Sequence, residues 1–200
     1  YLEKLNPDKV IYEVFPLTLA VDGIDSSNDL ISNDKNDIYS LKMALNVNNI
    51  TTYNTFIYSS LRDLLGLDKT FKETKNRGKD TYISGGFVEK KLEFYQPIKL
   101  KKKKIELKQQ QLEAFKFIIN LLKEQNIKVI LVFAPITESY YSRYTNVKYF
   151  DSIMNSYSEY YNFNKMMSLN DSLHFYDSHH LNQNGVDEFN HKLIQVLKKD

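Results

Sequence analysis

The residues best suited to chemistry gather near the C-terminus, in residues 175–185. Asp177 precedes His180 by three residues, in a short segment that is unlike a long helix. An aspartate at this spacing on a turn can hydrogen-bond one imidazole nitrogen and leave the other free to accept a proton from a serine. We therefore predict that Asp177 and His180 are catalytic residues, the orienting acid and the base of a hydrolytic triad.

Other interpretations of this segment stay open. The carboxylate of Asp177 could cap the helix that follows, with the histidine packed beside it. His179 could take the place of His180 as the partner of Asp177. Asp177, His179 and His180 could also hold a divalent metal ion, but no further ligand cluster supports this, so we expect neither metal nor cofactor.

The composition describes an ordinary globular chain. With 42% hydrophobic and 26% charged residues, 200 residues can bury a core within one domain. The net charge of +2 is too small for a nucleic-acid-binding protein with a basic surface, and only residues 99–104 are locally basic. Such a lysine run could contact a polyanion or a membrane surface, but it is more often a solvated face. The absence of cysteine excludes disulfides and a cysteine nucleophile.

Predicted strands that alternate with predicted helices along the chain indicate an α/β fold with a parallel sheet. Residues 9–15 and 128–134 are β-branched and apolar and each run is followed by a proline, as expected for buried strands. Apolar residues at helical spacing predict helices around 38–45, 53–64, 106–125, 146–158 and 183–198. Residues 160–164 and 173–176 are weaker candidates for a last strand, whereas 21–36 should be irregular and 68–104 a long connection with room for a hairpin.

The position of the Asp177 segment suits a binding site. Ligands of open parallel sheets bind beyond the carboxyl ends of the strands. The segment follows the last strand candidates and precedes the C-terminal helix. We therefore expect the site at the edge of the sheet where the strands end.

The pattern Asp177-x-x-His180-Leu181-Asn182-x-x-Gly185 resembles the final block of the SGNH (GDSL-type) hydrolase superfamily. Residues 10–14 and 175–177 are similar to its envelope branch, which includes the teichoic-acid D-alanine transfer protein. The resemblance covers residues 7–18 and 106–198. It implies a three-layer α/β/α sandwich over residues 1–200, with residues 19–104 as an insertion within it.

The resemblance also implies a function and a place. It indicates a serine esterase or O-acyltransferase in the cell envelope, acting on acylated carbohydrate or an envelope polymer. It implies contact with a membrane only through an anchor upstream of Tyr1, and the small net charge indicates no nucleic acid as partner. The alternative is a non-catalytic envelope protein of the same fold, whose tyrosines in residues 140–150 stack on a glycan.

The chain departs from the family pattern at the nucleophile. The family's serine follows a first strand that would lie upstream of residues 9–15, where only residues 1–8 are present. We therefore expect an N-terminally truncated domain that lacks this strand and is inactive by itself. Ser26 and Ser27 follow the wrong strand for the role. Thr18 stands near the position of the family's oxyanion-hole asparagine and could donate one hydrogen bond.

Overall fold

The computed structural model describes residues 2–67, 74–84 and 87–198. They divide into two compact units, a helical unit within residues 21–74 and a larger unit formed by the residues on either side of it. The larger unit holds a parallel three-stranded sheet and a small antiparallel sheet. The predicted α/β class with a parallel sheet is therefore confirmed.

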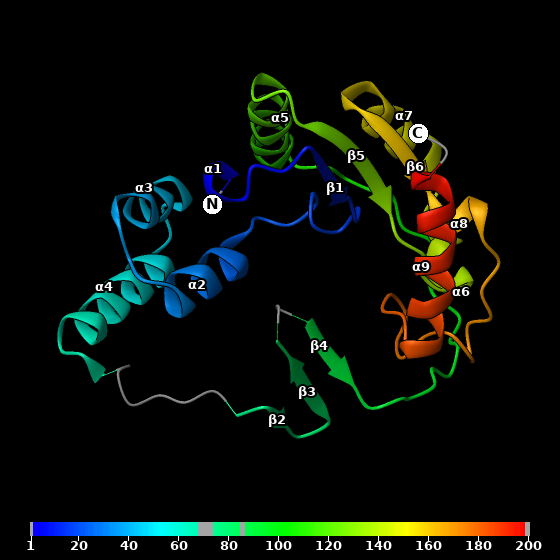
Figure 1. Ribbon diagram of the computed structural model, residues 1–200, viewed down its shortest axis with the longest axis horizontal. Coiled ribbons are helices and arrows are strands. Elements are labelled where there is room, and N and C mark those ends of the chain that lie inside the picture. The colour runs from blue at the N-terminus through cyan, green and yellow to red at the C-terminus, as the bar shows by residue number, and fades with distance from the viewer. Residues whose placement is uncertain (1, 68–73, 85–86, 199–200) are drawn as a thin grey trace. The chain divides into compact units, whose positions relative to one another are not determined.

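The parallel sheet has the strand order β1–β5–β6 (Figure 1). Its strands are β1 (Lys9–Glu13), β5 (Lys128–Phe133) and β6 (Glu159–Asn162). The predictions for residues 9–15 and 128–134 are confirmed, and β6 corresponds to the candidate at 160–164. The prediction of a strand at 173–176 is wrong, because Phe175 makes only an isolated bridge to Leu181.

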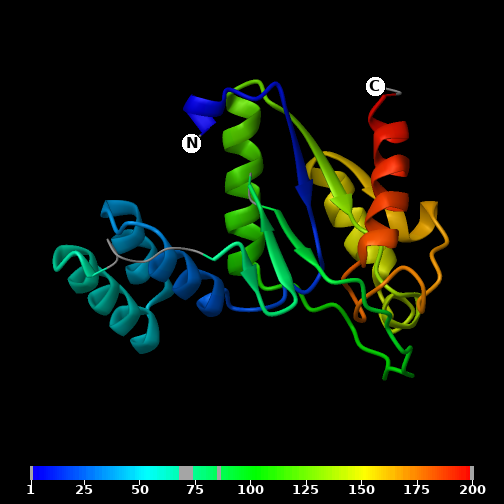
Figure 2. The ribbon, with the colours of Figure 1, turned by 60° about the horizontal axis from the view of Figure 1, so that its bottom comes forward.

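The central strand β5 is buried along almost its whole length, and its side chains alternate between two clusters. Val129, Leu131 and Phe133 belong to the cluster that includes α5 (Gln109–Glu124) and α7 (Val147–Tyr157). Ile130 and Val132 pack instead with α9 (Gln183–Leu197). Accordingly, α5 and α9 lie on opposite sides of the sheet (Figure 1, Figure 2).

The helices form because each has one apolar stripe to bury. In α5 the stripe is Phe115, Ile119 and Leu122, all of which are nearly inaccessible. The predicted helices 106–125, 146–158 and 183–198 are confirmed as α5, α7 and α9. The described residues of the larger unit also form the short helices α1 (Leu2–Leu5), α6 (Glu138–Tyr141) and α8 (Phe163–Met166).

The small antiparallel sheet lies in the long connection. It consists of β2 (Asn76–Arg77), β3 (Asp80–Ile83) and β4 (Phe87–Lys90), in that order. It contains the hairpin that residues 68–104 had room for, although residues 68–73, 85 and 86 lie outside the described residues. Beyond β4, still within the larger unit, the Tyr95 amide donates to the Phe175 carbonyl at 2.9 Å.

The helical unit contains α2 (Ile24–Asn33), α3 (Ile38–Val47) and α4 (Ile50–Leu64). The two later helices were predicted, but the irregular structure expected at 21–36 is wrong. Asp22 accepts a hydrogen bond from the Ile24 amide at the start of α2, and Ile31 is buried. The hydroxyl of Ser59 then donates to the Ile31 carbonyl at 2.8 Å and ties α4 to α2.

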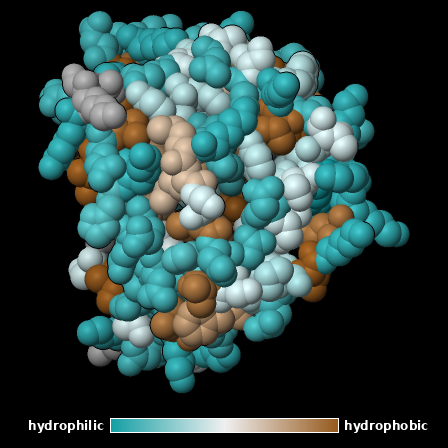
Figure 3. Space-filling view, turned by 90° about the vertical axis from the view of Figure 1, so that its right-hand side faces the viewer, coloured by the Kyte–Doolittle hydropathy of each residue, from teal (hydrophilic) through white to brown (hydrophobic). Residues whose placement is uncertain are grey.

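None of the helices in the described part of the chain is long and apolar enough to cross a bilayer. On the face of the larger unit that carries α9, apolar side chains form small patches separated by hydrophilic ones (Figure 3).

Candidate acid–base site

The Asp177 segment is a closed loop. Its two ends are joined by the bridge between Phe175 and Leu181 and by a 3.0 Å hydrogen bond from the Tyr176 amide to the His180 carbonyl. The Phe175 side chain is buried and anchors the loop in the larger unit. The intervening residues, including Asp177, therefore form a tight turn with a defined conformation.

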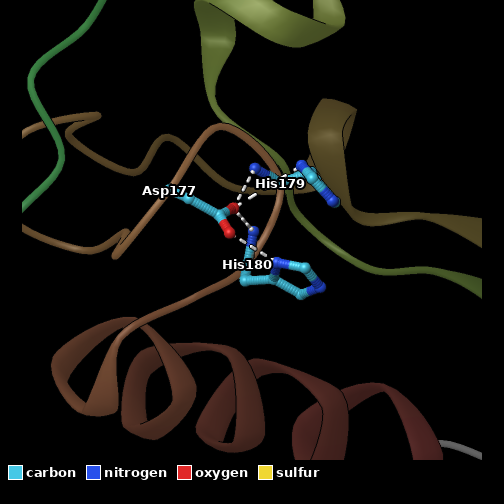
Figure 4. A group of neighbouring side chains, drawn as sticks. All are labelled: Asp177, His179 and His180. Atoms are coloured by element: carbon cyan, nitrogen blue, oxygen red, sulfur yellow. Dashed lines mark hydrogen bonds and ion pairs between the residues drawn. The ribbon is translucent and has the colours of Figure 1, made fainter. Parts of the chain in front are cut away.

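Asp177 and His180 are brought together by this turn (Figure 4). The carboxylate oxygen Oδ2 of Asp177 lies 2.7 Å from Nδ1 of His180. The second oxygen, Oδ1, accepts the backbone amides of His179 and His180, each at 2.8 Å. One carboxylate thus fixes both the backbone of the turn and the ring of His180.

The surroundings of Asp177 favour its ionised form. Partial burial raises the pKa of the carboxyl. The hydrogen bonds from the His179 amide and from the His180 ring and amide lower this pKa by more than burial raises it, so it lies below the ordinary value. Asp177 is therefore a carboxylate at neutral pH. It can orient the His180 ring and stabilise its protonated form.

His180 is the more accessible of the two histidines. Its side chain is 59% exposed, and Nε2 has no hydrogen-bond partner among the residues that the structure describes. Figure 4 shows the near nitrogen of the ring facing Asp177, whereas the far nitrogen points away from it and carries no dashed line. This nitrogen is free to exchange a proton with a bound group.

His179, by contrast, is packed among aromatic rings. Its imidazole is stacked on Phe15 with an interplanar angle of 4° and a centroid distance of 5.6 Å, and the ring of Tyr140 lies 5.5 Å away. Nδ1 lies 3.0 Å from the hydroxyl of Ser178. Burial lowers the pKa of His179, so it is neutral over a wider pH range than an exposed histidine. Asp177 Oδ1 is 3.5 Å from His179 Nδ1, so His180 is the closer partner.

Asn182 and Gly185 explain the rest of the sequence pattern. Asn182, rather than Asp177, caps α9: its Oδ1 accepts the Gly185 amide at 3.1 Å. Its Nδ2 donates to the carbonyls of Glu93 and Leu173, each at 3.0 Å. A Cβ at Gly185 would lie 2.1 Å from the carbonyl oxygen of His174, so only glycine fits there.

Thr137 is a supporting residue that the sequence did not reveal. It follows β5 and is completely buried. Its hydroxyl and its amide donate to the Ser178 carbonyl at 2.7 and 3.2 Å. This contact is made to a backbone carbonyl 41 residues away. The identity of residue 178 therefore does not indicate that Thr137 binds there. Thr137 therefore holds the turn next to the carboxyl end of β5 through these two hydrogen bonds.

The carboxyl end of β1 also lies near the site. Burial raises the pKa of Glu13, and the charge of the nearby His180 lowers it in part. Phe15, just beyond the strand, stacks on His179. The site is therefore located where β1 and β5 end, as expected for a parallel sheet.

The hydroxyl groups considered from the sequence do not complete a triad. Thr18 donates its hydroxyl to the Phe15 carbonyl at 2.7 Å, and Ser26 and Ser27 lie in α2 of the helical unit. In residues 2–67, 74–84 and 87–198, no hydroxyl is hydrogen-bonded to the His180 ring. The described residues thus bring together a carboxylate and an imidazole, but none of them provides a hydroxyl nucleophile bonded to the His180 ring.

A metal ion is the other chemistry that this cluster could support. Asp177, His179 and His180 each offer a ligand atom, and these atoms lie within 4.8 Å of one another. Ligation through Nδ1 of His180 would, however, replace the 2.7 Å hydrogen bond that orients its ring.

Three of the four tyrosines in residues 140–150 are partly buried against the core. Tyr140, Tyr141 and Tyr144 pack against the α5 side of the core, and only Tyr149 has a largely exposed ring. Three of the four tyrosine rings proposed to stack on a sugar are therefore already in contact with other residues of the protein.

Comparison with known proteins gives no further assignment. No family model, curated protein or solved structure matches the chain.

Proposed function

We propose that the Asp177–His180 pair is the acid–base half of a serine esterase or O-acyltransferase. The observation that carries the proposal is the 2.7 Å contact between Asp177 Oδ2 and His180 Nδ1, which leaves the exposed Nε2 without a partner among the described residues. The closed loop, the Asn182 cap and the Thr137 contact support it, since they hold both side chains in place.

In the proposed reaction, a serine outside these 200 residues attacks the carbonyl carbon of an ester. His180 Nε2 accepts the serine proton, and Asp177 stabilises the resulting imidazolium. The tetrahedral intermediate collapses when His180 returns the proton to the leaving alcohol, which gives an acyl-serine. Water or an acceptor hydroxyl then attacks this ester by the same steps in reverse order.

The finer fold and the setting belong to the same proposal. Helices on both sides of the parallel sheet are consistent with an SGNH-like three-layer domain whose nucleophile strand would pair beside β1. By the same resemblance, the substrate would be an acylated carbohydrate or polymer of the cell envelope.

The proposal is tested on the product of the complete reading frame. We expect a fluorophosphonate probe to label one serine in it and p-nitrophenyl acetate to be hydrolysed. His180→Ala should lower turnover by at least about a thousandfold, as for loss of a triad member. His191→Ala, which removes an exposed histidine from α9, is the matched control and should leave turnover unchanged.

Two results would contradict the proposal. One is labelling of a serine within the isolated 200-residue chain, which would place the nucleophile elsewhere. The other is a full-length product with no reactive serine, or one whose turnover survives His180→Ala.

A further inference from the structure

A pocket of about 300 Å³ opens directly beside His180. Its apolar lining includes Phe87 and Val88 of β4, Leu181, and Val186 of α9. His180 itself contributes to the lining, so a molecule in the pocket is within reach of its ring. The volume is at the lower end of the range for small-molecule sites.

The apolar side chains that line the pocket are partly exposed to solvent and could be covered by a ligand. Phe87 and Val88 are 47% and 50% exposed, although their side chains are apolar. Both stand on a short strand that pairs only with β3 among the described strands. Covering these side chains would remove apolar surface from water, which favours a hydrocarbon chain as occupant.

The pocket also carries positive charge. Lys90 lies with its Nζ 4.7 Å from the centroid of the Tyr176 ring and 3.1 Å from its hydroxyl. Its nearest carboxylate is Asp80 at 3.8 Å, a loose contact. The neighbouring Lys91 also lines the pocket and makes no ion pair within the part of the chain described.

We propose that this pocket binds the acyl chain of a substrate that also carries an anionic group, a phosphate or a carboxylate, held by Lys90 and Lys91. The inference rests on the proposed function in that the ester carbonyl would then lie at His180. It goes further because it defines the substrate as an anionic amphiphile. Charge complementarity selects this class over a neutral lipid or an uncharged sugar ester.

The binding part can be tested on the 200-residue chain without any catalysis. Octyl phosphate and octanoate, each below its micellar concentration, are titrated at low salt and followed by NMR shifts of the pocket residues. Both should bind, and the tighter one identifies the anionic group. Octanol, which lacks the charge, should bind about tenfold more weakly, and inorganic phosphate, which lacks the chain, should shift no pocket resonance.

Variants separate the two contributions. Lys90→Gln with Lys91→Gln should weaken octyl phosphate binding about tenfold and leave octanol binding unchanged. Phe87→Ala should weaken the binding of both octyl phosphate and octanol about fivefold. The matched controls are Lys116→Gln and Phe117→Ala, which change exposed residues of α5 away from the pocket and should have no effect. Circular dichroism confirms that each variant is folded.

The outcomes distinguish this inference from the proposed function. Equal affinity for octanol and octyl phosphate, or affinity that Phe87→Ala leaves intact, would overturn the pocket assignment even if the enzyme proposal holds. Anion-dependent binding that persists in His180→Ala, together with a full-length product lacking a reactive serine, would keep the pocket and remove the esterase.

Discussion

The loop that carries Asp177 and the helical unit of α2, α3 and α4 are held together in different ways. In the loop and at the start of α9, specific side chains bond to specific backbone atoms: Asp177 to two amides, Asn182 to three carbonyls and one amide. In the helical unit such bonds lie at helix ends and between helices, as from Ser59 to the Ile31 carbonyl. Few of its described side chains are fully buried, and several leucines remain exposed, among them Leu30, Leu45, Leu61 and Leu64.

The difference has a physical meaning. A loop without regular structure must satisfy its backbone groups through side chains, so the identity of each residue matters. A helix satisfies its own backbone, so an exposed position tolerates most substitutions. Substitutions in the loop should therefore cost far more stability than substitutions on the helical surface.

Gly185→Ala should have the largest effect. The added Cβ would meet the His174 carbonyl at 2.1 Å, and the first turn of α9 would have to shift. We expect a loss of about 3 kcal/mol in the free energy of unfolding, measured with urea. Gly78→Ala is the control, since its Cβ meets nothing within 4 Å and costs only the strain of a positive φ, about 1 kcal/mol. Equal losses would show that the close approach at Gly185 is relaxed in solution.

Asn182→Ala should come next, at about 2 kcal/mol. The substitution removes the cap of α9 and leaves the bonds to the Glu93 and Leu173 carbonyls unmade. Asn155→Ala is a matched control because that side chain donates only to a carbonyl of its own helix, one turn earlier. It should change stability by less than about 0.5 kcal/mol. A loss in Asn155→Ala as large as in Asn182→Ala would contradict the role of the cap.

The pH dependence of stability should reveal the packed histidine. In the unfolded chain a histidine titrates near its usual pKa of about 6.5, whereas burial lowers the pKa of His179 in the folded state. Between the two values the unfolded chain binds more protons, so folding becomes less favourable as pH falls through 6.5 toward the folded pKa.

His179→Phe should retain the stacking on Phe15 and lose this titration. The drop in stability between about pH 7.5 and pH 5.5 should then be smaller than in the wild type, as measured by urea unfolding at both values. An unchanged drop would mean that His179 is protonated as readily in the folded protein as in the unfolded chain.

Leu64→Ala should have the smallest effect. The side chain is 82% exposed at the end of α4, so its removal should change stability by less than about 0.5 kcal/mol. A loss above about 1.5 kcal/mol would show that the helical surface is covered in solution, and the contrast with the loop would disappear.

The parts of the fold that were predictable are those with a long, regular pattern. The apolar run of β5 and the stripe of α5 identify themselves, because burial on fixed faces repeats along the sequence. The helix α2 escaped prediction because Asp, Ser and Asn dominate it and only Ile31 supplies a fully buried apolar side chain.

The site shows the same division. Asp177 and His180 were predicted as a pair because their contact is local, three residues apart within one turn. Thr137 was not, because its hydroxyl binds a backbone carbonyl from a distant segment, and backbone contacts leave no trace in the identity of the partner. The pocket wall at Phe87 and Val88 was equally hidden, since it depends on how β4 packs beside the loop.

The most direct measurement is nitrogen NMR of the His180 imidazole, at a pH where the ring is neutral. If Asp177 orients the ring as the 2.7 Å contact indicates, the proton resides on Nδ1, whose nitrogen resonance then lies upfield of that of Nε2, the unprotonated acceptor. Asp177→Asn should abolish this preference. A wild-type ring protonated on Nε2 would contradict the proposal that His180 is poised as a base.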